Sequence, residues 1–153
     1  MKISTRRDVD VAPDRVFAAL TDFTRFEQKA RAAGAQVDRT NGESRGMAAW
    51  HVRFDYRGRS RKADLRVVTY DPDTQLAIKA ELDGIHTLFN VEVMEVAPNC
   101  ARMFVSLDIR PTTMKGRLLV QSLKLAKTSM TRRLDRRLDQ FAREIERRPA
   151  GGI

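Results

Sequence analysis

Side chains that commonly carry catalysis or hold metals are sparse in this sequence. It has two histidines, His51 and His86, and one cysteine, Cys100. No spacing of His, Cys, Asp or Glu resembles a metal site, and no catalytic triad can be assembled around either histidine. The glycines lack the strand and helix context in which backbone N–H groups bind phosphate. The sequence therefore predicts no metal, nucleotide or other cofactor.

Positive charge is the most conspicuous chemical property of the chain. The net charge is +9, and residues 113–148 supply most of it, because eleven basic and four acidic residues lie there. A second group, which we call the basic hairpin, surrounds one predicted turn and consists of Arg57, Arg59, Arg61 and Lys62. Such groups are either ordinary solvated surface or a contact for an anionic partner, including an anionic membrane. Both interpretations stay open.

The C-terminal part of the chain predicts one long amphipathic helix from Met114 to Arg148. Its apolar side chains recur at steps of three and four, on one stripe: Leu119, Leu123, Ala126, Met130, Leu134, Leu138, Phe141 and Ile145. Charged residues on the other faces, partly paired at helical spacing, are expected to be solvated. A helix of this length spans roughly 50 Å, so it needs a broad concave surface to cover its stripe.

The preceding residues predict one strand, two short helices and a meander of strands. Alternation predicts a strand from Lys2 to Val11, and helical patterns begin at Pro13 and run again from Phe23 to Ala33. Six strands then follow, separated by turns at Asn41-Gly42, Arg57-Gly58, Asp71-Pro72-Asp73, Asp83-Gly84 and Pro98-Asn99. The sequence thus predicts an α+β fold in which a curved, seven-stranded antiparallel sheet wraps around the long C-terminal helix.

In two predicted strands, the alternation of apolar residues indicates which side chains face the core. In residues 60–70 the alternation places Val67 on the apolar face and Tyr70 on the opposite face. Residues 86–96 contain two phases, one through Phe89, Val91 and Val93 and the other through Met94 and Val96. A bulge or burial on both faces would explain this second pattern.

The order of elements and the opening segment VDVAPDRVFAALTDF, residues 9–23, resemble the SRPBCC or START-related superfamily. Its members include the major birch pollen allergen, polyketide cyclases and aromatases, and lipid-transfer domains. The resemblance covers nearly the whole chain and implies the helix-grip fold. We expect a single domain at residues 1–148 and a short tail at 149–153.

The resemblance also implies a cavity for a small hydrophobic molecule between the long helix and the sheet. Strand alternation and helical phase predict the apolar lining: Trp50, Val52, Phe54, Leu65, Val67, Ile78, Val105, Leu107, Leu119, Leu123, Ala126 and Met130. The predicted polar contacts are Tyr56, His86 and Asn90, and the family's loop order places the basic hairpin at the cavity mouth. The same apolar side chains would also form an ordinary core without any ligand.

Three functions remain open. The favoured one is noncatalytic binding or transfer of a lipid, isoprenoid, polyketide-like compound or anionic amphiphile. The second is a cyclase or dehydratase without a cofactor, using Tyr56, Asn90, His86 and Arg7. The third is a nucleic-acid or ribosome-associated module on the basic helix, although no RNP-like strand or helix-turn-helix accompanies it. The absence of a membrane-spanning apolar run and of a secretory signal predicts a cytoplasmic location.

Overall fold

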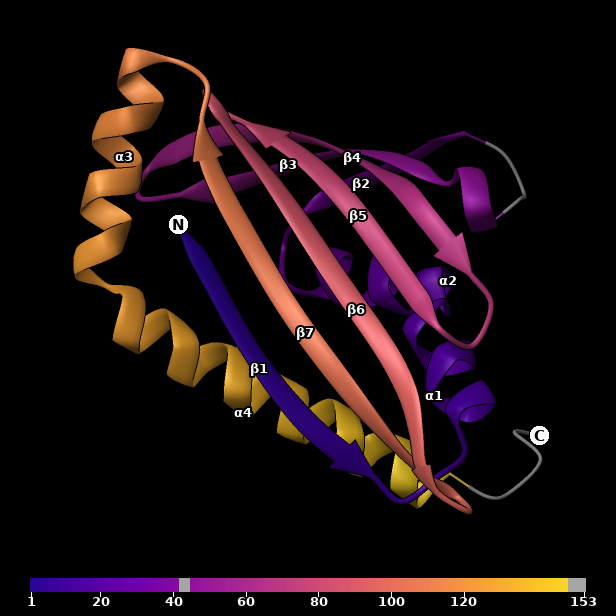
Figure 1. Cartoon of the computed structure of the whole chain (residues 1–153). Coiled ribbons are helices and arrows are strands. Elements are labelled where there is room, and N and C mark those ends of the chain that lie inside the picture. Colours follow the sequence, from indigo (N-terminus) through magenta and orange to yellow (C-terminus); the bar gives the residue numbers. More distant parts are fainter. Residues whose placement is uncertain (42–44, 149–153) are drawn as a thin grey trace.

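The computed structural model describes residues 1–41 and 45–148, which form a seven-stranded antiparallel sheet with helices packed on one face (Figure 1). The first elements are β1 (Lys2–Val9), α1 (Pro13–Leu20) and α2 (Phe23–Ala32). The next are β2 (Gln36–Asn41), η1 (Arg45–Met47), β3 (Ala49–Tyr56), β4 (Arg59–Asp71), β5 (Gln75–Leu82), β6 (Ile85–Ala97) and β7 (Cys100–Pro111). The last are α3 (Met114–Leu125) and α4 (Lys127–Arg147). The predicted tail and Gly42 of the predicted first turn lie outside the described residues.

The sheet confirms the predicted fold class. Its strand order is β1-β7-β6-β5-β4-β3-β2, so the strands from β2 to β7 form a meander and the first strand pairs with the last. The main core lies between this sheet and α1, α2 and α4, where Phe17, Leu138 and Ile145 are buried. Pro13 begins α1, where its missing N–H costs nothing, and the Asp22 side chain caps α2 by accepting from the Arg25 N–H.

The expectation of one continuous helix from Met114 to Arg148 is wrong. The helix ends at Leu125 and restarts at Lys127, and Figure 1 shows the two parts meeting at an angle. Val120 of α3 packs with Ile85 and Ile109 in a small separate cluster, whereas α4 packs on the main core. The two helices thus contact different parts of a curved sheet, and the bend between them leaves Leu119 and Ala126 of the predicted stripe exposed.

A β-bulge changes the predicted phase of β4. The pairing with β5 shifts between Val67 and Thr69, so Val68 is exposed and Tyr70 turns toward the core. The Tyr70 ring meets Phe17 edge-on, with 5.3 Å between the centroids. In β6 the inward phase is the one that contains Val91, while Met94 is exposed. The ambiguity of residues 86–96 is thereby resolved without burial on both faces.

Acidic residues of α4 connect this helix to other elements. Asp139 pairs with Arg143 at i,i+4, as the sequence predicts, but it also pairs with Arg7 of β1 at 2.9 Å. Glu144 pairs with Arg25 of α2 at 2.9 Å. The sequence predicted a solvated, partly salt-bridged face, and the structure adds that some of these carboxylates also join α4 to β1 and α2.

Gly116 determines how closely α3 approaches the sheet. Its N–H donates to the Thr113 hydroxyl at 3.0 Å, which caps the helix. A Cβ at Gly116 would lie 2.1 Å from the carbonyl oxygen of Gly84 in the β5–β6 turn. Only glycine permits this approach, and the first turn of α3 is therefore fixed against the turn between β5 and β6.

We expect Gly116→Ala to lower the free energy of unfolding by about 1–3 kcal/mol, because the added methyl group overpacks the contact with Gly84. This loss should appear although alanine favours a helix by about 1 kcal/mol over glycine. Ser122→Ala, on the exposed side of the same helix, is the control and should be neutral or slightly stabilising. Denaturant unfolding measures both variants, and a Gly116→Ala protein as stable as the wild type would contradict the close contact.

Candidate functional site

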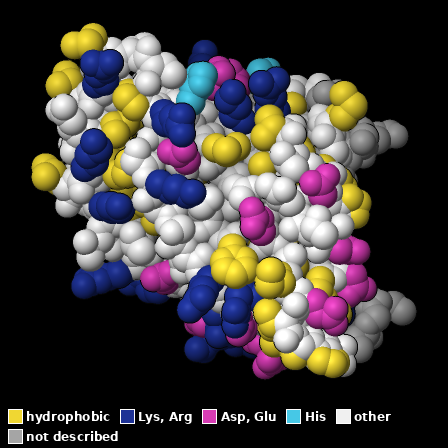
Figure 2. Space-filling model, viewed as in Figure 1, with side chains coloured by type: hydrophobic (Ala, Val, Ile, Leu, Met, Phe, Trp, Pro, Cys, Tyr) yellow, Lys and Arg dark blue, Asp and Glu magenta, His cyan; other side chains and the backbone are white. Residues whose placement is uncertain are grey.

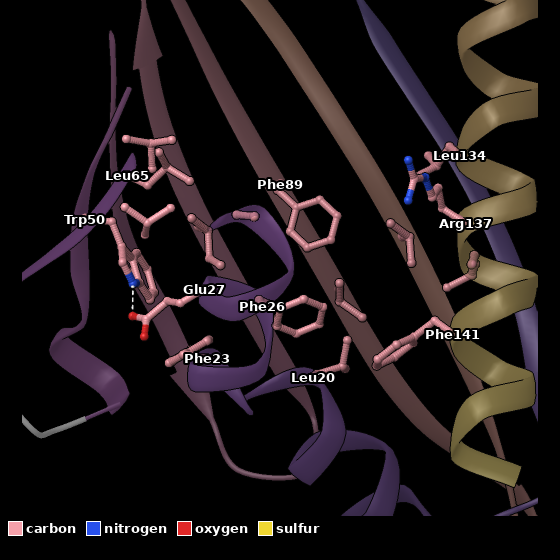
Figure 3. A pocket seen from close by; sticks show the side chains of 17 residues that line it. Leu20, Phe23, Phe26, Glu27, Trp50, Leu65, Phe89, Leu134, Arg137 and Phe141 are labelled. Carbon is pink, nitrogen blue, oxygen red and sulfur yellow. Dashed lines mark hydrogen bonds between the residues drawn. The ribbon is translucent and has the colours of Figure 1, made fainter. Parts of the chain in front are cut away.

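A cavity of about 470 Å³ lies between the concave face of the sheet and the helices α1, α2 and α4 (Figure 3). The sheet contributes Val37, Trp50, Val52, Leu65, Ile78, Phe89, Val91 and Val105. The helices contribute Leu20, Phe23, Phe26, Glu27, Ala30, Leu134, Arg137, Leu138 and Phe141. Apart from Glu27 and Arg137, the lining is apolar. This size and composition are typical of sites for small organic molecules.

Two of the helices that line the cavity, α2 and α4, each present one face to it. The lining residues of α2 are Phe23, Phe26, Glu27 and Ala30, and those of α4 are Leu134, Arg137, Leu138 and Phe141. Both sets follow the spacing i, i+3, i+4, i+7, which places four side chains on one side of a helix. Strand alternation aims the sheet residues at the same space. The cavity is thus formed by regular faces of secondary structure, not by loops.

Glu27 is a buried carboxylate on the cavity wall, with 9% of its surface exposed. Its Oε2 accepts hydrogen bonds from Trp50 Nε1 at 2.7 Å and from Arg39 Nε at 2.6 Å. Burial acts to raise the pKa of Glu27, but the hydrogen bonds from Arg39 and Trp50 outweigh it and hold the pKa below its usual value. Glu27 is therefore ionised at neutral pH. Among the described residues, its second oxygen accepts no hydrogen bond.

Trp50 is held in place from two sides. Its indole N–H donates to Glu27, and its ring meets Phe23 edge-on with 5.0 Å between the centroids. Figure 3 shows Trp50, Glu27 and Phe23 together on one side of the cavity. Because Trp50 is the only tryptophan in the chain, it is also a built-in spectroscopic reporter of this wall.

Two side chains of the lining, Phe26 of α2 and Arg137 of α4, reach the surface, and we infer that the cavity opens beside them. Phe26 is 41% exposed, and Arg137 is exposed as well. The ring of Phe26 packs against that of Phe141, with 6.1 Å between the centroids. Figure 3 places Arg137 beside Leu134, across the cavity from Glu27. Within residues 1–41 and 45–148, no carboxylate pairs with Arg137, so its charge is available at the mouth.

The structure brings part of the predicted lining together. Trp50, Val52, Leu65, Ile78 and Val105 line the cavity. The other predicted apolar residues lie elsewhere: Val67 in the main core, Leu107, Leu123 and Met130 beside the small cluster, Leu119 and Ala126 partly or fully exposed, and Phe54 half-buried outside the lining. The bend at Ala126 explains the absence of Leu119, Leu123 and Ala126 from the lining, because it carries α3 away from the cavity.

The predicted polar contacts also lie outside the lining. Tyr56 is exposed, with the Arg57 guanidinium 5.3 Å from its ring centroid. His86 lines a separate polar hollow of about 280 Å³, with its Nε2 3.3 Å from Glu81. Asn90 Oδ1 accepts from Gln75 Nε2 at 2.8 Å, and Arg7 pairs with Asp139. These contacts hold the side chains of Tyr56, His86, Asn90 and Arg7 outside the cavity lining.

The basic hairpin does not line the cavity either. Arg57, Arg59 and Lys62 are exposed, and Arg61 pairs with Asp83 at 2.7 Å. Sequence reasoning instead missed Glu27, Arg137 and the aromatic residues of α2 and α4. The i, i+3, i+4, i+7 spacing of residues 23–30 was a usable signal for the lining residues of α2.

In the part of the chain that the structure describes, no group of His, Cys, Asp and Glu could hold a metal ion, and no helix is long and apolar enough to span a membrane.

Together, the wrapped sheet, the helices and the enclosed space define a domain of the helix-grip class shared by START-related proteins. The model of the family described as "Polyketide cyclase / dehydrase and lipid transport" matches residues 1–146, and the chain belongs to this family. This match confirms the resemblance to the superfamily that the sequence predicted. The bend at Ala126 is therefore compatible with membership of it.

Solved structures with the same fold differ widely in sequence. The Zhui aromatase/cyclase from a Streptomyces species has 14% identity and a TM-score of 0.70, with 100% of this chain and 99% of that chain covered. TTHA0849 from Thermus thermophilus has 13% identity and a TM-score of 0.67, with 95% and 97% covered. A START superfamily protein from Mycobacterium smegmatis has 15% identity and a TM-score of 0.53, with 88% and 97% covered. No curated protein matches the sequence. At these identities the likeness shows the fold alone.

We expect Glu27→Gln to lower the free energy of unfolding at neutral pH by about 1–3 kcal/mol, because the charged hydrogen bonds to Arg39 and Trp50 are weakened. Since the pKa of Glu27 is lower in the folded than in the unfolded chain, its ionised form stabilises the fold above the unfolded-state pKa of about 4.3. This contribution is lost as the pH falls through the folded-state pKa. The difference between variant and wild type should therefore shrink below about pH 4.

Denaturant unfolding at a series of pH values measures this dependence. Glu92→Gln, at an exposed position of β6, is the control and should leave stability nearly unchanged. A destabilisation by Glu27→Gln that stays constant across the acidic range would show that the charge of Glu27 is not what stabilises the wall.

Proposed function

We propose that the protein binds a small, mostly apolar molecule in this cavity and carries it in the cytoplasm without transforming it. A lipid, an isoprenoid or a polyketide-like compound fits this description. The observation that supports the proposal is the cavity itself, with a volume of about 470 Å³, an apolar lining, and Phe26 and Arg137 exposed at its edge. Small-molecule sites commonly enclose about 300–1,000 Å³, with a few polar groups that orient the ligand.

The two charged groups suggest how such a ligand is oriented. Arg137 at the mouth offers a cation to a carboxylate or phosphate, while the rest of the lining contacts an apolar body. Glu27, on the opposite wall, offers its second oxygen to a hydroxyl or amine donor. The proposed ligand is therefore an anionic amphiphile whose charged end lies at the opening and whose apolar part lies inside.

A cyclase or dehydratase is the second candidate, because the family description includes this activity. Glu27 is the one carboxylate that the described residues bring to the lining, but its lowered pKa makes it a weak base at neutral pH. The residues expected from the sequence to serve a cyclase, Tyr56, Asn90 and His86, lie outside the lining. We therefore favour noncatalytic binding. The nucleic-acid alternative rests on charge alone.

Filling the cavity should abolish ligand uptake. Ala30→Phe places a ring in the lining from α2, and we expect it to weaken binding of anilinonaphthalene sulfonate at least about tenfold, since a filled volume excludes the probe. Energy transfer from Trp50 to the probe measures occupancy next to the wall. Neither Ala30→Phe nor the control Ala126→Phe adds a second tryptophan, so Trp50 remains the single energy donor.

Ala126→Phe is the matched control, because Ala126 is exposed at the bend between α3 and α4. It should bind the probe as the wild type does, and circular dichroism should show both variants folded. If Ala30→Phe binds as tightly as Ala126→Phe, the cavity is not the site of uptake and the proposed function fails.

Arg137→Gln should reduce affinity for a fatty acid by about fivefold while leaving the fatty alcohol of the same chain length unaffected, because only the acid carries a charge for the guanidinium. Competition against the fluorescent probe gives both affinities. Arg136→Gln, one residue away and also exposed, controls for the loss of one positive charge. Equal losses for acid and alcohol, or equal effects of the two substitutions, would contradict an anion contact at Arg137.

A further inference from the structure

The helix α3 has a second apolar face that nothing in the described chain covers. Its inner face, with Gly116, Val120 and Leu123, packs toward the small cluster at the ends of β6 and β7. Met114, Leu118 and Leu125 are 74%, 68% and 91% exposed. On a helix with 3.6 residues per turn these three side chains fall within about 40° of one another, opposite the buried face. We call them the outer stripe.

Cations flank the outer stripe on both sides. Lys115, Arg117, Lys124 and Lys127 belong to α3 or to the first turn of α4, and no acidic residue occurs between Asp108 and Asp135. Figure 2 shows apolar and basic side chains interleaved over α3, in the upper left of the view. Across the described residues, these four cations form no ion pair. An apolar stripe bordered only by positive charge is the pattern of a helix that lies in an anionic lipid interface.

The position of α3 allows a flat partner to reach this stripe. Figure 1 shows α3 at the outer edge of the molecule, bent away from the line of α4. The Thr113 cap and the contact of Gly116 with Gly84 hold its first turn against the β5–β6 turn. The stripe is therefore presented by a firmly held helix, so contact with a surface requires no rearrangement of the fold.

We propose that the outer face of α3 docks the protein on the surface of an anionic lipid bilayer. Met114, Leu118 and Leu125 enter the interface between headgroups and acyl chains, and the flanking cations contact lipid phosphates. A second copy of this chain fits less well, because two such faces would bring their positive charges together. The docking face differs from the cavity and does not depend on any ligand there.

Vesicle sedimentation tests the proposal with two variants of the full chain. The first, Met114→Ser/Leu118→Ser/Leu125→Ser, removes the apolar stripe without changing charge. The second, Lys115→Gln/Arg117→Gln/Lys124→Gln/Lys127→Gln, removes the flanking charges. We expect the wild type to bind vesicles of phosphatidylglycerol and phosphatidylcholine, but not pure phosphatidylcholine, at physiological salt. Each variant should bind at least about tenfold more weakly.

Matched controls separate a localised face from general charge or stickiness. Arg132→Gln/Arg133→Gln/Arg136→Gln/Arg147→Gln removes the same charge from exposed positions of α4, and Met47→Ser/Val68→Ser/Met94→Ser removes exposed apolar side chains elsewhere. Both should keep wild-type vesicle binding. Equal loss in the α4 variant would overturn the proposal in favour of a diffuse charge effect, and so would a wild type that ignores anionic vesicles. A wild-type dimer in light scattering that the stripe variant converts to monomer would overturn it in favour of self-association.

Discussion

The structure depends on a concave sheet whose apolar face is larger than the helices can fill. Short helices α1 and α2 cover one part of this face and α4 covers another, and the two coverings meet at the rim through Phe26 and Phe141. Behind that rim a space of about 470 Å³ remains. Protein interiors are otherwise closely packed, so a space of this size is a candidate site for a small molecule. The geometry that makes the fold therefore also makes the candidate site.

One buried charge joins the stability of the fold to the shape of this site. Glu27 of α2 receives hydrogen bonds from Arg39 of β2 and Trp50 of β3, so a single carboxylate connects three elements around the cavity wall. A carboxylate buried without such donors would be strongly unfavourable. The same interaction orients the indole ring. The stability of the fold and the polarity of this wall thus depend on the same few atoms.

The sequence predicted the fold class well and the site less well. Element order and strand alternation are local signals, so they identified the meander, the short helices and sheet residues such as Trp50 and Ile78. The bend at Ala126 could not be predicted in this way, because Ala126 favours helix and the bend arises from packing on a curved sheet. That error moved Leu119, Leu123 and Ala126 into the predicted lining. The Glu27 contacts were missed because they join residues distant in sequence.

The central claim is that this cavity takes up an apolar ligand, and the indole N–H of Trp50 tests it most directly. As the only tryptophan, it gives one indole signal in the nuclear magnetic resonance spectrum of nitrogen-labelled protein. Titration with a lipid extract of the organism's own cells should shift this signal saturably, since the ring forms part of the wall. If lipid from the extract binds the protein while the indole signal stays unchanged, the ligand lies elsewhere and the account is contradicted.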